Sequence, residues 1–354
     1  MTSTLPSCSL FYRDGSSDKE YNAIVEESGN GYVVNFSYGR RGNATATGTK
    51  TSSPVSLDDA TKIYNKLVQE KTAKGYQPDA SAAPFAGISA VSDKVSTGLI
   101  PQLLNPITEA EMERYIKDDN YLAQEKLDGK RIMATSEIDG VVTSNRKGLT
   151  CGVPKEIERG VSVFRGTILD GEMIGDRYHV FDLLRLGGVD WRNESCLARF
   201  KMLEAMMQKL NPHRLVLVRC AETEADKRAL VESLRHKEGV VFKLKSSRYV
   251  PGRPNSGGNQ FKCKFWSDVS VQVIKVNDKA SVQVAISDKG KLIPVGNVTT
   301  NGHVQPSVGD IVDVTYLYAY KGGSLYQPKY KCVRTDHDVD DISVLKYKSE
   351  DTED

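Results

Sequence analysis

Alternating apolar and polar residues dominate the first part of the chain, and one stretch there has helical spacing. Residues 21–25 and 31–38 alternate on either side of the turn Ser28-Gly-Asn-Gly, which predicts two antiparallel strands. Ser56 is a suitable N-cap for a helix that ends at Gly75. The apolar positions of that helix are Ala60, Ile63, Tyr64, Leu67 and Val68. Residues 1–78 are therefore expected to form a small α+β module.

The middle of the chain mixes both periodicities. Residues 79–99 are rich in Ala, Ser, Gly and Pro, which is typical of a linker. Residues 100–266 then predict a domain of strands and helices. The expected strands are residues 131–134, 161–169, 180–183, 215–220 and 239–245, and the expected helices are residues 109–117, 197–209 and 226–236.

Short strands alone are expected from residue 267 to residue 344. Alternating runs occur at residues 269–274, 280–286 and 311–318, with turns at Asp288-Lys-Gly, Asn301-Gly and Lys321-Gly-Gly. This pattern predicts a small β-barrel. Residues 345–354 are expected to be a solvated, partly frayed acidic tail. Together the segments predict an α+β multidomain protein, and its 354 residues suit two or three domains.

Composition narrows the class of protein. No apolar run is long enough to span a bilayer, and the N-terminus lacks the pattern of a signal peptide, so we expect no membrane partner. The six cysteines lie far apart without C-x-x-C spacing, which argues against a zinc site or a disulfide scaffold and favours a reducing, cytoplasmic compartment.

Charge is balanced overall but uneven along the chain. The net charge is only +2, from 48 Lys and Arg against 46 Asp and Glu. Residues 239–267 contain no acidic residue, although Lys243, Lys245, Arg248, Arg253, Lys262 and Lys264 lie there. A local basic strip in a nearly neutral protein indicates a focused anion site rather than a diffuse nucleic-acid coat.

An ordered series of short motifs carries the chemistry. It begins with Lys126-Leu-Asp-Gly-Lys-Arg131, which has the pattern K-x-D-G-x-R. Asp-Gly is a common turn pair, so this motif alone could be a solvated turn. The later members are Leu169-Asp-Gly-Glu172, Phe181-Asp-Leu183, Glu238-Gly-Val-Val-Phe-Lys243 and Lys262-Cys-Lys264. Each motif alone is weak evidence for a function, but their occurrence in this order is much stronger evidence.

This series resembles the covalent nucleotidyltransferase superfamily and, within it, the ATP-dependent DNA ligases. The resemblance covers residues 100 to about 337. It implies a nucleotidyltransferase domain, with ATP-grasp-like mixed antiparallel sheets and helices, followed by an OB-fold barrel. ATP would be the AMP donor, Mg²⁺ or Mn²⁺ the metal, and nicked or broken duplex DNA the partner. The compact size suggests a bacterial or phage-encoded protein, and we expect a monomer.

The resemblance also implies roles for individual residues. Lys126 would take AMP covalently, and Glu125 or its backbone would face the adenine amino group. Phe181 would stack on adenine, and Glu172 would bind ribose or metal. Arg131 and Arg146 would hold ribose and phosphate, Glu238 would serve the metal, and Lys243, Lys262 and Lys264 would contact the α-phosphate. In the barrel, Arg334 and Asp336 look like the final motif, where His337 stands in place of the usual lysine.

The N-terminal segment resembles a WGR domain. The matching residues are Phe36-Ser-Tyr-Gly-Arg-Arg-Gly42 and, after the helix, Lys71-Thr-Ala-Lys-Gly-Tyr76. Tyr38 replaces the usual tryptophan. The resemblance implies nucleic-acid binding, including DNA ends, through Tyr38, Arg40 and Arg41. A small α+β domain with Gly-Arg-Arg-Gly in a solvated loop is the simpler alternative.

These residue types suit transfer of a nucleotide. A lysine attacks phosphorus only when it is deprotonated, and neighbouring cations favour that form. The same cations would stabilise charge on the α-phosphate, while carboxylates would hold a hard ion such as Mg²⁺. The implied cycle passes AMP from Lys126 to a 5′-phosphate, which the 3′-hydroxyl then attacks.

Other functions share parts of this pattern. An RNA ligase and a GTP-using capping enzyme have the same lysine chemistry and motif order. A non-catalytic protein that binds DNA ends could keep the fold, although the complete first motif argues against it. An NAD-dependent ligase fits poorly because its extra N-terminal module and four-cysteine zinc finger are absent from the sequence.

Overall fold

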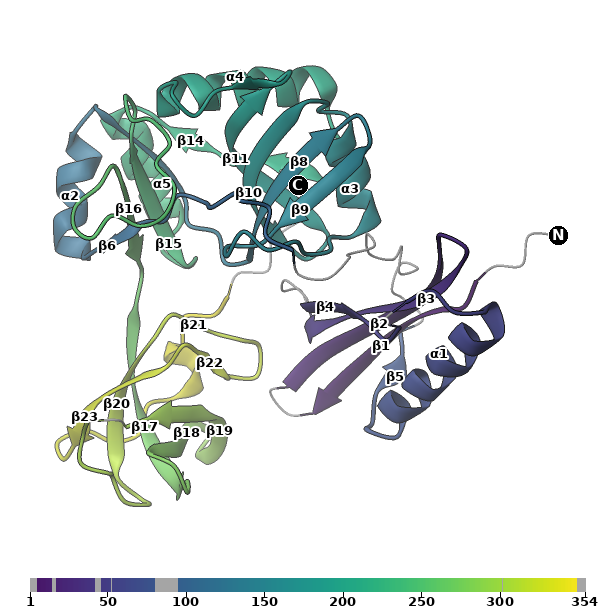
Figure 1. The fold of residues 1–354 in the computed structure, drawn as a ribbon. Helices are drawn as coiled ribbons and strands as arrows, with labels where there is room; N and C mark the ends of the chain where they lie inside the picture. Colours follow the sequence, from purple (N-terminus) through teal and green to yellow (C-terminus); the bar gives the residue numbers. More distant parts are fainter. Residues whose placement is uncertain are drawn as a thin grey trace.

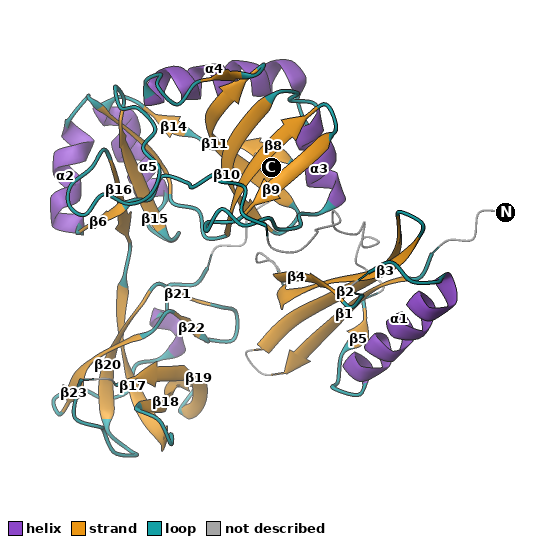
Figure 2. Ribbon diagram, in the orientation of Figure 1, coloured by secondary structure: helices purple, strands orange, loops and turns teal. Residues whose placement is uncertain are grey.

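The computed structural model describes residues 5–14, 17–41, 46–51, 53–79, 95–300 and 302–348. Four larger sheets, a small hairpin and five α-helices make up the regular structure of these ranges. Figure 1 shows an N-terminal module, a central body and a C-terminal strand-rich part, and Figure 2 shows how strongly strands predominate. Within these ranges, no helix is long and apolar enough to cross a membrane.

The N-terminal module is a five-stranded antiparallel sheet with one helix packed against it. The strand order is β4-β3-β2-β1-β5. The elements are β1 (Ser7–Asp14), β2 (Ser17–Ser28), β3 (Gly31–Arg40), β4 (Ala46–Thr49), α1 (Leu57–Thr72) and β5 (Gln77–Pro78). The Ser56 hydroxyl caps α1 by accepting a hydrogen bond from the Asp59 amide at 3.1 Å. Both expected strands and the expected helix contribute to one core, so the predicted α+β module is confirmed.

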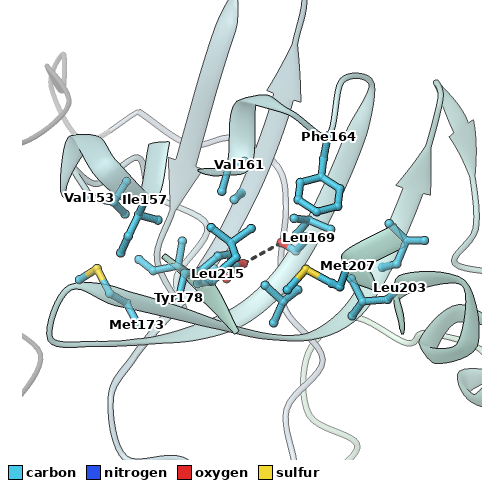
Figure 3. Packing of buried hydrophobic residues seen from close by; sticks show 14 residues of the cluster. Val153, Ile157, Val161, Phe164, Leu169, Met173, Tyr178, Leu203, Met207 and Leu215 are labelled. Carbon is cyan, nitrogen blue, oxygen red and sulfur yellow. Dashed lines mark hydrogen bonds between the residues drawn. The ribbon is translucent and has the colours of Figure 1, made fainter. Parts of the chain in front are cut away.

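The first sheet of the central body is six-stranded, in the order β12-β11-β10-β8-β9, with β13 parallel to β11. Its strands are β8 (Lys130–Glu137), β9 (Gly140–Ser144), β10 (Thr167–Ile174), β11 (Arg177–Leu186), β12 (Val189–Asp190) and β13 (Leu215–Leu217). Helices α3 (Lys155–Ser162) and α4 (Cys196–Leu210) cover it. Figure 3 shows the core that these elements share, including Tyr178 and Phe164.

The second sheet of the central body has the order β14-β7-β15-β16-β6. Its strands are β6 (Asn105–Ile107), β7 (Tyr121–Glu125), β14 (Cys220–Ala221), β15 (Gly239–Leu244) and β16 (Gln260–Lys264). Helices α2 (Glu109–Lys117) and α5 (Glu224–Ser233) pack on one face of it. The expected helix 109–117 is confirmed, whereas the helix expected at 226–236 begins and ends earlier.

One expected strand is wrong in its first half. Residues 161–169 were expected to be a strand, but Val161 belongs to α3 and strand β10 begins only at Thr167. Ile157 and Val161 are four residues apart and both fully buried, so they face the core from one side of the helix. The alternation Val161-Ser-Val-Phe is therefore fortuitous.

The C-terminal part is a five-stranded antiparallel sheet in the order β19-β18-β17-β20-β23. Its elements are β17 (Ser267–Val276), β18 (Ser281–Asp288), β19 (Lys291–Thr299), β20 (Ile311–Tyr316), the hairpin of β21 (Tyr318–Ala319) and β22 (Leu325–Tyr326), β23 (Lys329–Arg334) and the 3₁₀ turn η1 (Ile342–Val344). Edge strands β19 and β23 also contact each other, so the sheet curves toward closure as expected for a small barrel. We refer to residues 267–348 as the barrel.

Parts of three predicted segments lie outside the described residues. They are residues 80–94 of the linker, Asn301 of a turn and residues 349–354 of the tail. The expectation of a frayed tail is wrong for residues 345–348. Leu345 is buried in the barrel core, and Lys346 donates hydrogen bonds to the Phe265 carbonyl and, at 3.4 Å, to the Lys237 carbonyl. This segment therefore holds the barrel against the central body.

Candidate active site

Lys126 lies at the end of β7, where the chain leaves the second sheet of the central body. Its amide donates to the Gly239 carbonyl at 2.9 Å, which fixes the start of the loop 126–129. Two glycines near this hydrogen bond have no room for a side chain. A Cβ on Gly129 would lie 2.3 Å from the Met173 carbonyl oxygen, and one on Gly239 would lie 2.0 Å from that of Cys263. The glycines of two sequence motifs thus allow strands to approach Lys126 closely.

Glu238 joins the first and last lysines of the motif series. Its carboxylate accepts the Lys126 Nζ at 2.7 Å and the Lys264 Nζ at 2.9 Å, and only 4% of the residue is exposed. Because Gly239 pairs with Lys264 across β15 and β16, strand pairing brings these groups together. The predicted metal ligand Glu238 therefore acts here as the shared counter-ion of two lysines.

The register of the second sheet explains why the cations share one face. Gln124, Val241 and Lys262 are directly opposite one another on β7, β15 and β16, so their side chains point the same way. Lys243 lies two residues after Val241 and points to the same face. The intervening residues, including Val240 and Cys263, point into the core.

The first sheet supplies the opposite wall. Arg131, Glu172 and His179 are cross-strand neighbours on β8, β10 and β11. The Arg131 guanidinium binds the buried Asp170 carboxylate through Nε at 2.6 Å and Nη2 at 2.8 Å, and Tyr249 donates to the same carboxylate at 2.7 Å. These bonds fix Arg131 in position, so it offers a preorganised positive charge.

A pocket lies between the two walls, and we call it the first pocket. Phe181 stands between two cations there, because the Arg131 guanidinium carbon and the Lys243 Nζ lie 4.5 and 4.6 Å from its ring centroid. Phe181 is only partly buried, so it faces this pocket rather than the core. The lining residues are Leu104, Gln124, Glu125, Lys126, Leu127, Arg131, Glu172, Phe181, Val241, Lys243 and Gln260. A flat ring bordered by cations suits a nucleobase and its phosphates.

A second pocket also borders Lys126, and the barrel helps to form it. The lining residues are Glu125, Lys126, Leu127, Asp128, Ile174, His179, His236, Lys237, Glu238, Tyr318 and Lys348. Glu125, Lys126 and Leu127 line both pockets, so the segment that carries the nucleophile candidate borders each of them.

Burial and neighbouring charges shift two pKa values at the site. Burial, with a further contribution from Glu238, raises the pKa of Glu172 to about 7, against the opposing effect of Arg131 and Lys126. Burial also lowers the pKa of Lys262, and the cations Lys126, Arg253, Lys264 and Arg146 lower it further. The site therefore combines crowded cations with a carboxyl group that titrates near neutrality.

The carboxylates fit a magnesium ion of the kind that retains water and substrate ligands. In the described part of the chain, no group of three or more His, Cys, Asp or Glu side chains is arranged to hold a metal by itself. Glu172 and Glu238 both lie beside Lys126 and repel each other electrostatically. Mg²⁺ commonly binds one or two carboxylates together with phosphate oxygens and water.

The final-motif residues are not brought to either pocket. Arg334 binds Asp313 at 2.9 Å and its near neighbour Asp336 at 2.8 Å, and it pairs with Ile311 in the barrel sheet. The His337 ring contacts the Asp338 carbonyl at 2.7 Å. In the described residues these groups stabilise the barrel, and neither pocket lining includes them.

Lys262 and Lys264 are in neither pocket lining, although Lys264 binds Glu238, which lines the second pocket. The remaining predicted residues also lie outside the two pockets. Arg146 is exposed in the turn after β9. Tyr38 is 49% exposed and stacks on Tyr21 with 6.1 Å between ring centroids. Arg40 lies against Tyr320 of the barrel, and Arg41 binds Asp79 at 2.9 Å. Both arginines therefore already have protein partners.

Sequence reasoning missed several residues that complete the site. Asp128 and Asp170 belong to the motifs that begin at Lys126 and Leu169, so the sequence could have identified them. Tyr318 and Lys348 had no such signal, because the surface that the barrel turns toward Lys126 depends on tertiary packing.

Two family models match the chain. Residues 7–83 match the WGR domain, and residues 106–265 match the mRNA capping enzyme, catalytic domain. The chain therefore contains a WGR domain followed by a nucleotidyltransferase domain, as the motifs predicted. No curated protein matches the chain.

Several solved structures are similar at low sequence identity. Pmar-Lig_Pre is 18% identical, with a TM-score of 0.51 over 67% of this chain and 67% of that chain. Mycobacterial DNA ligase D complexed with ATP and MES is 20% identical, with a TM-score of 0.42 over 70% and 98% of the two chains. The ATP-dependent DNA ligase from bacteriophage T7 in complex with ATP is 15% identical, with a TM-score of 0.36 over 66% and 98%. The first of these likenesses indicates a shared fold.

Proposed function

We propose that this chain is an ATP-dependent DNA ligase that seals breaks in duplex DNA through a covalent lysine–AMP intermediate. The observation that carries the proposal is that Lys126 lines two pockets. One pocket is bordered by Phe181 and cations, and the second extends to the barrel. A nucleophile that borders two sites can accept a group from one ligand and pass it to another.

In the first step, the Lys126 nitrogen attacks the α-phosphorus of ATP. A bond forms between nitrogen and phosphorus, the bond to the oxygen that bridges α- and β-phosphorus breaks, and pyrophosphate leaves while the amine loses its protons to solvent. Phe181 would stack on the purine, and Lys243, Lys262 and Lys264 would stabilise the negative charge on the α-phosphate. The ion pair with Glu238 must open first, because an ammonium group has no lone pair to donate.

In the second and third steps, AMP passes to DNA and leaves. An oxygen of the 5′-phosphate attacks the α-phosphorus, the phosphorus–nitrogen bond breaks and Lys126 takes up protons. The 3′-hydroxyl then attacks the activated 5′-phosphate, loses its proton and expels AMP. Glu238 would stabilise the ammonium form of Lys126 as it leaves.

Glu172 and Glu238 would hold Mg²⁺, which supplies charge neutralisation for the phosphates when it is bound. The WGR domain would hold duplex DNA through its backbone, with Tyr38 as an exposed aromatic contact. Such binding should weaken with salt and depend little on base sequence.

The decisive experiment is intact-mass analysis after incubation with ATP and Mg²⁺. The wild type should gain the mass of one AMP, Lys126→Ala should gain none, and Lys209→Ala, which changes an exposed lysine on α4, should behave like the wild type. Absence of an adduct on the wild type would leave only a role in DNA binding.

A guanylyltransferase is the second candidate, because residues 106–265 match the capping enzyme model. Adduct formation with GTP but not ATP would favour that function. A comparison of the sealing rates on nicked DNA and nicked RNA duplexes would then distinguish a DNA ligase from an RNA ligase of the same superfamily.

A further inference from the structure

Asp128, two residues after Lys126, is the point at which the barrel contacts the nucleophile's loop. The Tyr318 hydroxyl donates a hydrogen bond to Asp128 Oδ2, and the Tyr326 hydroxyl lies 3.4 Å from Oδ1. Tyr318 is 1% exposed and stacks on Tyr326, with 4.8 Å between ring centroids. Burial and the Asp128 carboxylate raise the pKa of Tyr318, so its hydroxyl remains a donor.

The barrel makes a second contact with the same network. Gln327 follows β22 directly, and its side-chain oxygen accepts the Lys264 Nζ at 3.0 Å. Gln327 has a φ of 51°, a left-handed conformation that is costly for a residue with a side chain. The hairpin and the residue after it thus contact both Asp128 and Lys264, and Lys264 is a partner of Glu238.

The docked barrel coincides with a particular state of Lys126. Its amine is paired with Glu238, and Glu238 is also paired with Lys264, which Gln327 holds. An ammonium group in an ion pair cannot attack ATP, and Lys126 has this form both before ATP reacts and after AMP has passed to DNA. The pockets distinguish the two partners more clearly, because Tyr318 lines the second pocket and Phe181 lines only the first. The docked barrel therefore borders the pocket that is not the proposed nucleotide site.

We propose that Tyr318 is a positioning residue for the DNA-dependent steps, acting through Asp128 to hold the barrel against the Lys126 loop, and that it is dispensable for the attack on ATP. This inference rests on the proposed ligase function. It predicts that loss of the Tyr318 hydroxyl slows the sealing of DNA and leaves the attack on ATP unchanged. A purely structural role of Tyr318 would slow both reactions alike.

The test compares Tyr318→Phe with the wild type in two single-turnover reactions. The first is the formation of the AMP adduct from ATP and Mg²⁺. The second is the sealing of nicked duplex DNA by enzyme that already carries AMP, with no free ATP. We expect the adduct rate to stay within about 2-fold and the sealing rate to fall at least about 10-fold, the size expected for a hydrogen bond to a charged acceptor.

Two further variants make the result specific. Tyr330→Phe removes a hydroxyl elsewhere in the barrel and should leave both rates unchanged. Tyr326→Phe removes the other hydroxyl that faces Asp128 and should reproduce the split between the two rates, which covers the case in which Tyr318→Phe folds poorly. An equal fall of both rates in either site variant, or unchanged sealing, would overturn the inference. A wild type that forms no adduct would instead overturn the ligase proposal itself.

Discussion

The Arg40 guanidinium of the WGR domain lies over the ring of Tyr320 in the barrel, with 3.7 Å between its central carbon and the ring centroid. Burial lowers the pKa of Arg40, so the contact is partly shielded from water. Tyr320 in turn packs edge-on against Tyr318, with 5.4 Å between centroids. A continuous set of contacts therefore runs from a predicted DNA-binding arginine to Asp128 beside Lys126.

A double-mutant cycle would measure the contact between Arg40 and Tyr320. Arg40→Ala and Tyr320→Leu should each lower the melting temperature slightly, and their coupling energy should be about 1 kcal/mol, as for a partly desolvated cation–π pair. Thermal melting of the two single variants and the double variant gives this value. Strict additivity would show that the two domains do not hold each other through this pair.

Tyr38 offers a test of DNA binding by the WGR domain. Tyr38→Ala should weaken binding of nicked duplex about 5- to 100-fold, because stacking of an aromatic ring on a base contributes about 1–3 kcal/mol. Fluorescence anisotropy of a labelled duplex would report it. Tyr38→Phe keeps the ring and should bind almost normally. Unchanged binding by Tyr38→Ala would remove Tyr38 from the DNA surface.

Phe181 provides a test of the purine site. Phe181→Ala should raise the KM for ATP in adduct formation by about 5- to 100-fold through lost stacking, with little change in the rate at saturation. Phe181→Trp supplies another flat ring and should retain most of the affinity. If Phe181→Ala lowered only the saturated rate, the ring would be acting on the chemistry and not on nucleotide binding.

Glu172 should make adduct formation depend on pH near neutrality. Its pKa is raised to about 7, mainly by burial, and only the ionised form can bind Mg²⁺ or accept ribose hydroxyl protons. The rate should therefore rise as pH increases through about 7, and Glu172→Gln should be slow and flat over this range. Glu20→Gln is the control, because burial also raises the pKa of Glu20, to about 6, in the N-terminal module.

The same group affects stability with the opposite sign. The folded protein keeps the Glu172 proton up to about pH 7, whereas the unfolded chain loses it near pH 4.5. Its contribution to the free energy of unfolding is therefore complete below pH 4.5 and is lost as pH rises through 7. Glu172→Gln should remove this loss, and melting curves across the range would detect it.

Arg199 and Asp182 form a buried ion pair that should matter for stability. Arg199 donates to Asp182 through Nε at 2.8 Å and Nη2 at 3.0 Å, and neither residue is more than 2% exposed. Arg199→Met would leave a buried carboxylate unpaired and should lower the free energy of unfolding by about 3–5 kcal/mol in a urea titration. Arg192→Met breaks an exposed pair with Asp190 and should cost less than about 1 kcal/mol. Equal costs would contradict this reasoning.

Local patterns were sufficient to predict much of the fold. Strands β2, β3, β17 and β18 contain alternating apolar residues over much of their length, and α1 has a capping serine and a clear apolar stripe, so local sequence was enough to predict these elements. Helix α3 was not predicted, because it has only eight residues and its N-cap, Pro154, provides no side-chain hydrogen bond. A helix that short carries little periodic signal, and its burial against the sheet decides its conformation.

The candidate site was predictable in its membership but not in its arrangement. The motif order selected Lys126, Arg131, Glu172, Phe181, Lys243 and Lys264, which the structure brings together. Their convergence depends on the pairing of β7, β15 and β16, which joins Lys126 to a residue 112 positions away. The domain limits and individual roles remain predictions. The barrel residues Tyr318 and Lys348 were missed because contacts between domains produce no periodic pattern of apolar residues in the sequence.

Glu238 carries a single negative charge between two ammonium groups, so this small region holds a surplus of one positive charge at rest. Conversion of Lys126 to a phosphoramidate would remove one of those ammonium groups, add the negative charge of the phosphate and leave the carboxylate with one partner. Under the proposed cycle, each turnover would thus alternate the neighbourhood of Glu238 between an excess of one positive charge and an excess of one negative charge. An ion that binds at this site would therefore experience a different electrostatic field before and after Lys126 carries AMP.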